Sequence, residues 1–181
     1  MKKIHPLYFI AVIPPCEQKE KIQELKESFA NKYRCKAALK SPPHITLHMP
    51  FRFPEEKEKE LIALLKEPYD SISSMISLNN FGCFPPRVIF IKVDEAGNLF
   101  SLYKEVSSRL RKVNVTNADY KNFGFNPHLT IAFRDLKKSV FNEAWPEYKQ
   151  EFFTSQFLVD KLCLLKHNGK HWEEFRFFGL S

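Results

Sequence analysis

The sequence contains little glycine and few cysteines, 5 and 4 respectively among 181 residues. The cysteines, at positions 16, 35, 83 and 163, are far apart and form no Cys-x-x-Cys pair, which argues against a zinc ribbon or a redox motif. Unpaired thiols in a reducing compartment explain them most simply.

Long hydrophobic runs are also missing. The longest uncharged apolar run, Leu7–Pro15, is shorter than the ~20 residues that a membrane helix needs. The basic start Met1-Lys2-Lys3 resembles the n-region of a signal peptide, but no small-residue cleavage site follows it. We therefore expect no membrane partner and predict that the N-terminal run forms the first strand of a cytoplasmic protein.

The composition is that of a soluble globular domain, with 44% apolar and 27% charged residues. The 18 phenylalanines can supply a dense core, and the length suits a single domain over residues 1–181. We expect a monomer. Lys and Arg exceed Asp and Glu by 7, which suits an anionic partner such as RNA or a nucleotide, although solubility alone would also account for this charge.

The hydrophobic pattern predicts the same order of elements twice, strand–helix–strand–helix–strand. The two halves cover roughly residues 1–84 and 85–181, and no flexible linker separates them. A polar loop is predicted over residues 114–126, and Asn168-Gly169 predicts a tight turn between the last two strands. The predicted strands are 7–13, 44–49, 72–81, 87–93, 128–133, 157–165 and 172–178; the predicted helices are 17–33, one opening at Pro54, 98–113 and 136–148.

One short motif also occurs twice. The pattern Pro-His-apolar-Thr-apolar occupies Pro43–Leu47 and again Pro127–Ile131, and its two histidines are 84 residues apart. Residues two apart in a strand point to the same side, so the His and Thr of each copy share one face and the apolar residues share the other. If the two halves pack as pseudo-symmetric lobes, both His-Thr pairs face one cleft.

Two facing histidines suit paired acid–base catalysis, because imidazole titrates near neutral pH. Of His44 and His128, the neutral one can take a proton from an attacking hydroxyl or water, and the protonated one can give a proton to the leaving oxygen. Thr46 and Thr130 can each donate a hydrogen bond to a phosphate oxygen. A phosphodiester fits best, because it is anionic and requires no metal ion when two histidines transfer the protons. These residues leave open which histidine is the acid.

The paired motifs resemble those of the two-histidine (2H) phosphoesterase superfamily, and their flanks resemble its 2′-5′ RNA ligase and cyclic phosphodiesterase branch. The first strand, Tyr8–Pro14, is similar to the opening strand of that branch. The resemblance implies an α+β fold of two pseudo-symmetric lobes, each an antiparallel sheet with outer helices, around a central cleft. It also implies hydrolysis of a 2′,3′-cyclic phosphate, or cleavage and ligation of a 2′-5′ linkage, without a metal or a cofactor. In that scheme His44 and His128 are catalytic, and Thr46 and Thr130 bind the phosphate.

Two further residues are candidates for contact with the substrate. The branch often continues its second motif as Thr-Leu-Ala-Arg, whereas here the arginine comes one position later, at Arg134. Strand alternation then places Arg134 on the face of His128, and Phe133 with the core. His48 falls on the face of His44 by the same alternation, with a half-exposed structural role as the alternative. A nucleobase could also stack on an aromatic residue near the motifs, namely Phe81, Phe84, Phe123 or Phe125.

Two functions from different classes remain. The first is a metal-independent phosphodiesterase that acts on RNA ends or nucleotides. The second is a non-catalytic RNA- or nucleotide-binding module that keeps the cleft as an anion site. Both motifs retain His and Thr, which favours the enzyme, and a metal hydrolase is disfavoured because the sequence places no carboxylates near either histidine.

Overall fold

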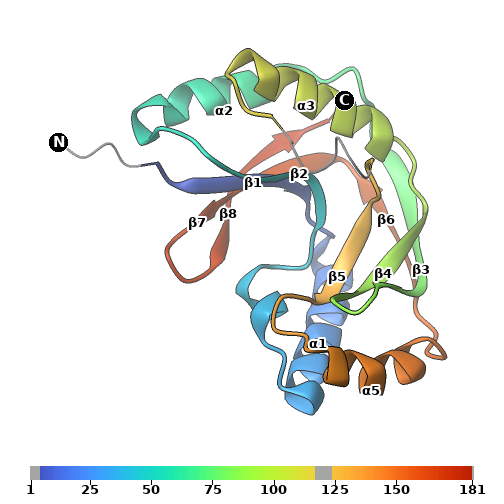
Figure 1. Ribbon diagram of the computed structural model, residues 1–181. Helices are drawn as coiled ribbons and strands as arrows, with labels where there is room; N and C mark the ends of the chain where they lie inside the picture. The colour runs from blue at the N-terminus through green and yellow to red at the C-terminus, as the bar shows by residue number, and fades with distance from the viewer. Residues whose placement is uncertain (1–4, 117–123, 181) are drawn as a thin grey trace.

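The computed structural model describes residues 5–116 and 124–180, and these form one curled antiparallel sheet of eight strands in the order β6-β3-β4-β5-β2-β1-β7-β8 (Figure 1). The strands are β1 (Leu7–Val12), β2 (Ile45–Arg52), β3 (Ser74–Phe84), β4 (Val88–Glu95), β5 (His128–Ala132), β6 (Thr154–Val159), β7 (Lys161–His167) and β8 (Trp172–Gly179). The α-helices of the described residues are α1 (Cys16–Tyr33), α2 (Glu58–Lys66), α3 (Leu99–Lys112) and α5 (Lys138–Tyr148), and short 3-10 turns cover Ala37–Lys40 and Glu55–Lys57.

The predicted α+β class with two sheet-containing halves is confirmed. One half consists of β6-β3-β4-β5 and the other of β2-β1-β7-β8, and a single register pair, Ile45 with Leu129, joins them between β2 and β5. The half β2-β1-β7-β8 takes strands from both ends of the chain, because β7 pairs beside β1 and β8 beside β7. The other half consists of four strands that are consecutive in sequence, β3 to β6. This half is therefore inserted in sequence between β2 and β7 of the first, and the two halves are continuous in the sheet.

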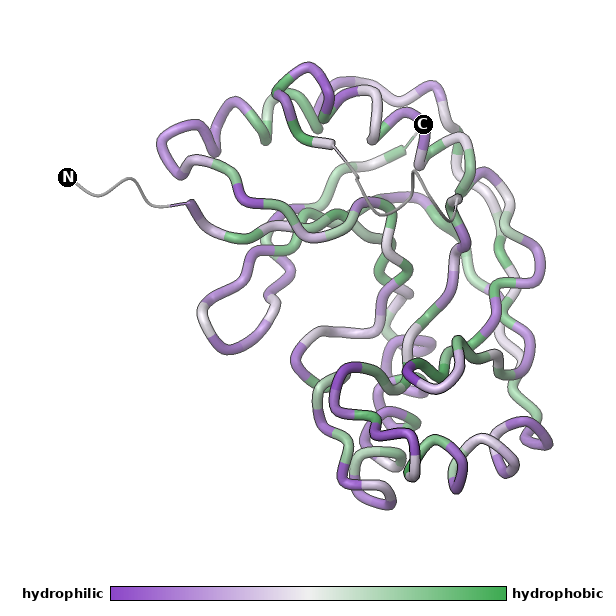
Figure 2. The backbone as a smooth tube through the Cα atoms, viewed as in Figure 1, coloured by the Kyte–Doolittle hydropathy of each residue, from purple (hydrophilic) through white to green (hydrophobic). Residues whose placement is uncertain are grey.

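The helices lie on the outer side of the curled sheet, with α2 and α3 over one half and α1 and α5 at the far end of the other (Figure 1). Each buries one apolar stripe, as the spacing of three and four predicts; in α1 the stripe includes Ile22, Phe29 and Tyr33, and the helix ends where Arg34 adopts a left-handed φ of 56°. Hydrophobic residues are concentrated in the strands, and hydrophilic residues in the outer helices and the β7–β8 hairpin (Figure 2). None of the described helices has the length and hydrophobicity to cross a membrane.

The strand predicted over 157–165 is wrong, because the structure divides it in two. The chain leaves the sheet at Asp160, so that Phe157 lies in β6 at one edge of the sheet and Leu162 lies in β7 beside β1. Both segments bury apolar side chains, so the sequence reads as one continuous apolar run across the break. The loop predicted over 114–126 falls largely on residues 117–123, which lie outside the described residues.

Candidate active site

The two Pro-His-x-Thr motifs fold as the alternation predicts. Ile45 and Leu47 in the first copy, and Leu129 and Ile131 in the second, are fully buried. The histidines and threonines point to the other side of the sheet, where they are half-buried. The buried apolar residues therefore fix which face carries the polar side chains.

The pairing of β2 with β5 relates the two motifs by a local two-fold axis. Ile45 and Leu129 occupy the same position in the two motifs, and they are antiparallel partners of each other. In the positions on either side of this antiparallel pair, the register places His44 opposite Thr130 and Thr46 opposite His128. The four polar side chains thus form one group, in which each histidine faces the threonine of the other motif.

The backbone before each motif orients the imidazole in the same way in both halves. Nδ1 of His44 lies 2.7 Å from the carbonyl oxygen of Pro42, and Nδ1 of His128 lies 2.7 Å from that of Asn126. A carbonyl oxygen only accepts, so Nδ1 carries the proton and donates it in each case. Nε2 of each ring is then the atom available to take or give a proton.

Both motifs line one cavity of about 680 Å³, within the range of small-molecule sites. Among the described residues that line it, the ionisable side chains are His44, His128 and Arg134, and none is Asp or Glu. The rest of the wall is mainly apolar or aromatic and includes Phe9, Phe84, Phe133, Trp172, Met49 and Val88. The cavity therefore combines a basic group at the two-fold axis with surfaces on which a planar ring can stack.

The two imidazoles differ in the aromatic rings that pack against them. The ring of Phe9 packs on His44 at 4.9 Å between centroids. His128 packs against two rings, Phe90 at 4.8 Å and Phe84 at 5.2 Å. Trp172 in turn contacts Phe9 edge-on at 4.6 Å, so an aromatic wall continues from His44 to the β7–β8 hairpin.

The surroundings favour the neutral form of both histidines. Burial above all, together with the nearby charges of Lys26 and His128, lowers the pKa of His44 to about 4, against the hydrogen bond to Pro42. Burial also lowers the pKa of His128, against its hydrogen bond to Asn126. The Lys26 ammonium group therefore makes the two imidazoles electrostatically different.

His48 does not reach the cavity, so the prediction that it shares the face of His44 is wrong. Ala11 pairs with Thr46 and Ile10 with His48, so β2 carries one extra residue at this point. Such a β-bulge breaks the alternation of side chains. His48 is consequently only 1% exposed, donates from Nδ1 to the carbonyl oxygen of Met49 at 2.9 Å, and packs in the core.

The second motif has the same bulge at the same position. Phe90 pairs with Thr130 and Ile89 with Ala132, so β5 also carries one extra residue after its threonine. Ala132 is buried, as is His48 at the corresponding position of the first motif. The local two-fold therefore extends beyond the His-x-Thr residues to the backbone irregularity that follows them.

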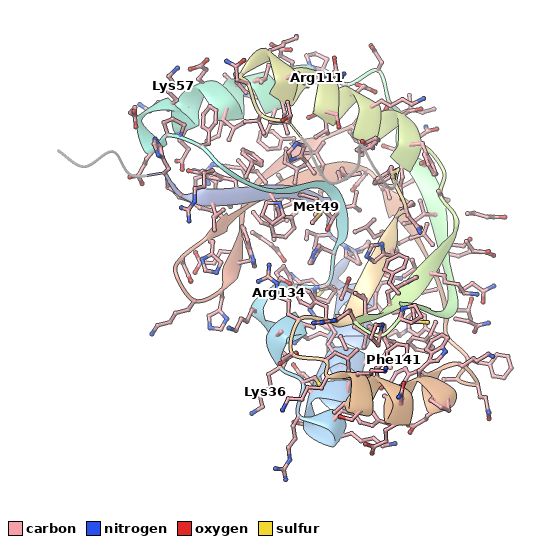
Figure 3. All side chains as sticks on the ribbon, viewed as in Figure 1. Lys36, Met49, Lys57, Arg111, Arg134 and Phe141 are labelled. Atoms are coloured by element: carbon pink, nitrogen blue, oxygen red, sulfur yellow. The ribbon has the colours of Figure 1, made fainter. Side chains whose placement is uncertain are left out.

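Arg134 lines the cavity, but not by strand alternation. β5 ends at Ala132, and Arg134 has a left-handed φ of 58°. Its guanidinium group lies 5.2 Å from the ring centroid of Phe133, which also lines the cavity, so the prediction that Phe133 joins the core is wrong. Figure 3 shows Arg134 and Met49 on the concave side of the sheet.

Sequence reasoning identified one of the aromatic residues at the cavity and missed others. Phe84 lines it, as proposed for a stacking residue, whereas Phe81 is buried in the core and Phe125 stacks on Tyr103 of α3. Phe123 lies outside the described residues. Phe9 and Trp172 were missed, although Phe9 alternates with the core residues of the first strand and so could have been found.

The described residues contain no group of three or more His, Cys, Asp or Glu side chains that could hold a metal ion. The ionisable groups of the cavity are instead the two imidazoles and one guanidinium group. This set can bind an anion and move protons.

Comparison with known proteins agrees with this geometry. The family model of the 2′-5′ RNA ligase superfamily matches residues 14–171. A protein of Geobacillus kaustophilus that is named as a phosphoesterase is 30% identical over 161 residues, which cover 87% of this chain and 86% of that protein. Another, from Oceanobacillus iheyensis, is 27% identical over 183 residues, with 96% and 98% covered.

Two solved structures share the fold. Escherichia coli LigT in complex with 3′-AMP gives a TM-score of 0.69 at 19% identity, over 98% of this chain and 99% of that one. TT0787 of Thermus thermophilus gives a TM-score of 0.69 at 22% identity, over 96% and 97%. With the family model matched over most of its length and both motifs at one cavity, the chain belongs to the 2′-5′ RNA ligase superfamily of two-histidine phosphoesterases.

Proposed function

We propose that this protein is a metal-independent phosphodiesterase that acts on nucleotides or RNA ends, by hydrolysis of a 2′,3′-cyclic phosphate or by cleavage or ligation of a 2′-5′ linkage. The observation that carries the proposal is the convergence of His44 and His128 on one cavity, each with Nδ1 bonded to a carbonyl oxygen. This arrangement leaves Nε2 of both rings for the reacting oxygens.

The mechanism requires one imidazole in each protonation state. The neutral ring takes the proton of the attacking water or hydroxyl, and the protonated ring gives a proton to the leaving oxygen. Thr46 and Thr130, which the strand register places opposite the histidines, donate hydrogen bonds to the non-bridging oxygens. Arg134 adds a positive charge at the cavity wall that favours an anionic substrate.

The lining favours a nucleotide over a small phosphoester. Phe84 and Trp172 offer ring surfaces at the same cavity as the histidines, and base–aromatic stacking contributes ~1–3 kcal/mol per base. Solved structures of Escherichia coli LigT hold 3′-AMP, ATP and NADP+, which supports a nucleotide here. The four unpaired cysteines are consistent with a cytoplasmic setting, which we propose together with a monomeric state.

The experiment is an assay of purified protein with 2′,3′-cyclic nucleotides in the presence of EDTA. We expect turnover, and expect His44→Ala and His128→Ala each to lower kcat by at least ~100-fold with the fold retained by circular dichroism. The double variant should lose far less than the product of the two effects, because the histidines act as one unit. His5→Ala, at an exposed histidine outside the cavity lining, is the matched control and should be neutral.

Three results would count against the proposal. A folded His128→Ala protein with near-full turnover would exclude the two-histidine mechanism. Wild-type protein that binds the nucleotides but leaves them unchanged would favour the second candidate, a non-catalytic binding module. Activity that is lost in EDTA and restored by a divalent metal would indicate a metal hydrolase instead.

A further inference from the structure

One buried charged residue has no part in the mechanism proposed above. Lys26, in the middle of α1, is only 2% exposed. Its Nζ donates a hydrogen bond to the carbonyl oxygen of Ser41 at 2.6 Å, and no carboxylate of the described residues forms a salt bridge with it. A buried amine without an ion-pair partner costs stability relative to an apolar side chain of similar shape. Stability of the core therefore does not explain the lysine.

The position of the hydrogen bond from Lys26 to Ser41 suggests a role for the buried lysine in the active site. Ser41 lines the catalytic cavity and directly precedes Pro42, whose carbonyl oxygen accepts from Nδ1 of His44. Lys26 thus fixes the backbone one residue before the group that orients the imidazole. α1 also packs against β5 and the turn Ala37–Lys40, so the helix that carries Lys26 contacts the strand of the second motif and the segment that leads into the first.

The second motif is held in a different way. Phe125, which precedes the orienting carbonyl of Asn126, stacks on the ring of Tyr103 in α3 at 4.4 Å between centroids. The two halves of the site therefore share their hydrogen bonds to histidine but differ in what supports them. The support behind His44 is a cation, and the support behind His128 is an aromatic stack.

We propose that Lys26 is a positioning residue of this active site: its buried amino group holds the Ser41–Pro42 backbone against His44 and places a positive charge behind that imidazole alone. The consequence is an assignment of roles. A nearby cation disfavours protonation of His44, so His44 is the general base and His128 the general acid. This assignment rests on the function proposed above, whereas the positioning itself does not.

The charged groups around His44 are positive and act on its protonation in the same direction. Lys26 and His128 both oppose protonation of His44. Burial lowers the pKa of Lys26 to about 7, against the opposing charge of Glu27 on the same helix, so the ammonium form persists in the acidic range where His44 titrates. Arg134 adds a further positive charge at the cavity wall.

The test uses Lys26→Met, which keeps the aliphatic stem and removes the charge, and Lys26→Arg, which keeps both the charge and a donor. Lys21→Met, at an exposed lysine of the same helix, is the matched control. In Lys26→Met we expect the His44 imidazole, followed by NMR, to titrate about one pH unit higher. The acidic limb of kcat/KM should shift by the same amount, and kcat should fall ~10-fold or more with KM little changed. Lys26→Arg should stay near the wild-type titration.

The outcomes separate the two proposals. An unchanged His44 titration in folded Lys26→Met, or the same loss of kcat in both Lys26 variants without any shift, would overturn the role of Lys26. A shifted titration in a protein without turnover would support Lys26 and refute the enzymatic function. If Lys26→Met does not fold, Lys26→Gln decides, because its amide can still donate to the Ser41 carbonyl oxygen but carries no charge: a raised His44 titration supports the proposal, and an unchanged one overturns it.

Discussion

The absence of a side chain at Gly82 leaves room for the ring of Phe90, which packs on His128. Gly82 and Phe90 are directly opposite each other on β3 and β4. A Cβ atom at Gly82 would lie 2.6 Å from Cε2 and 2.8 Å from Cζ of Phe90. The ring would have to withdraw by roughly 1 Å to regain ordinary van der Waals contact. Because Phe90 packs on His128, that movement reaches the imidazole.

We therefore predict that Gly82→Ala lowers both stability and activity. Overpacking costs ~1–3 kcal/mol, and the lower backbone entropy of alanine in a strand offsets ~0.5–1 kcal/mol of it. The net loss should be ~1–2 kcal/mol by urea unfolding. A displacement of about 1 Å at a catalytic group should cost ~10- to 100-fold in kcat on a cyclic nucleotide.

Two further variants make this prediction specific. Gly179→Ala is the matched control, because a Cβ atom there meets no atom within 4 Å: it should leave activity unchanged and should not lower stability. In a Phe90→Leu background the clashing ring atoms are gone, so Gly82→Ala should then cost little. An equal cost of Gly82→Ala in both backgrounds, or full activity of Gly82→Ala, would refute the coupling.

Three other predictions concern the site and its surroundings. Because burial lowers the pKa of both His44 and His128, kcat/KM should rise as the pH passes about 4 and fall before the ordinary histidine value of ~6.5, and an optimum above pH 7 would contradict this. Thr46→Val and Thr130→Val should each lower kcat/KM by ~10- to 100-fold without loss of stability, as measured by kinetics and thermal unfolding. His48→Asn should leave kcat unchanged but cost ~1–3 kcal/mol at pH 7. The lowered pKa of buried His48 means that the unfolded chain binds more protons, so wild-type stability should fall below pH ~6.5, and less steeply in this variant.

The sequence was most informative where one face of a strand is buried. Ile45 and Leu129 alternate with the histidines, and burial of the apolar face left one orientation for the polar face. The repetition of the motif then predicted a shared cavity. What the repetition did not reveal was the pairing of Ile45 with Leu129, which joins the two predicted sheets into one.

The failures came from backbone features that leave no compositional signal. The bulge after Thr46 turns His48 into the core, although the sequence continues to alternate through it. The break at Asp160 lies within an apolar run, so one strand was predicted where two lie on opposite halves of the sheet. Lys26 reads as one more charged residue of an exposed helix, and only its contact with Ser41 distinguishes it.

The break at Asp160 also bears on synthesis of the protein. A nascent chain that has reached the end of α5 contains β1 to β5, with β1 and β3 as the two outer strands of that sheet. Both then present unpaired backbone groups to other chains, a recognised cause of aggregation. The last segment pairs with both of these outer strands: β6 pairs with β3, and β7 pairs with β1 after the chain has crossed the sheet at Asp160. Premature termination before β6 therefore leaves β1 and β3 as exposed edges at once, whereas in the complete sheet both are covered and the outer strands are β6 and β8.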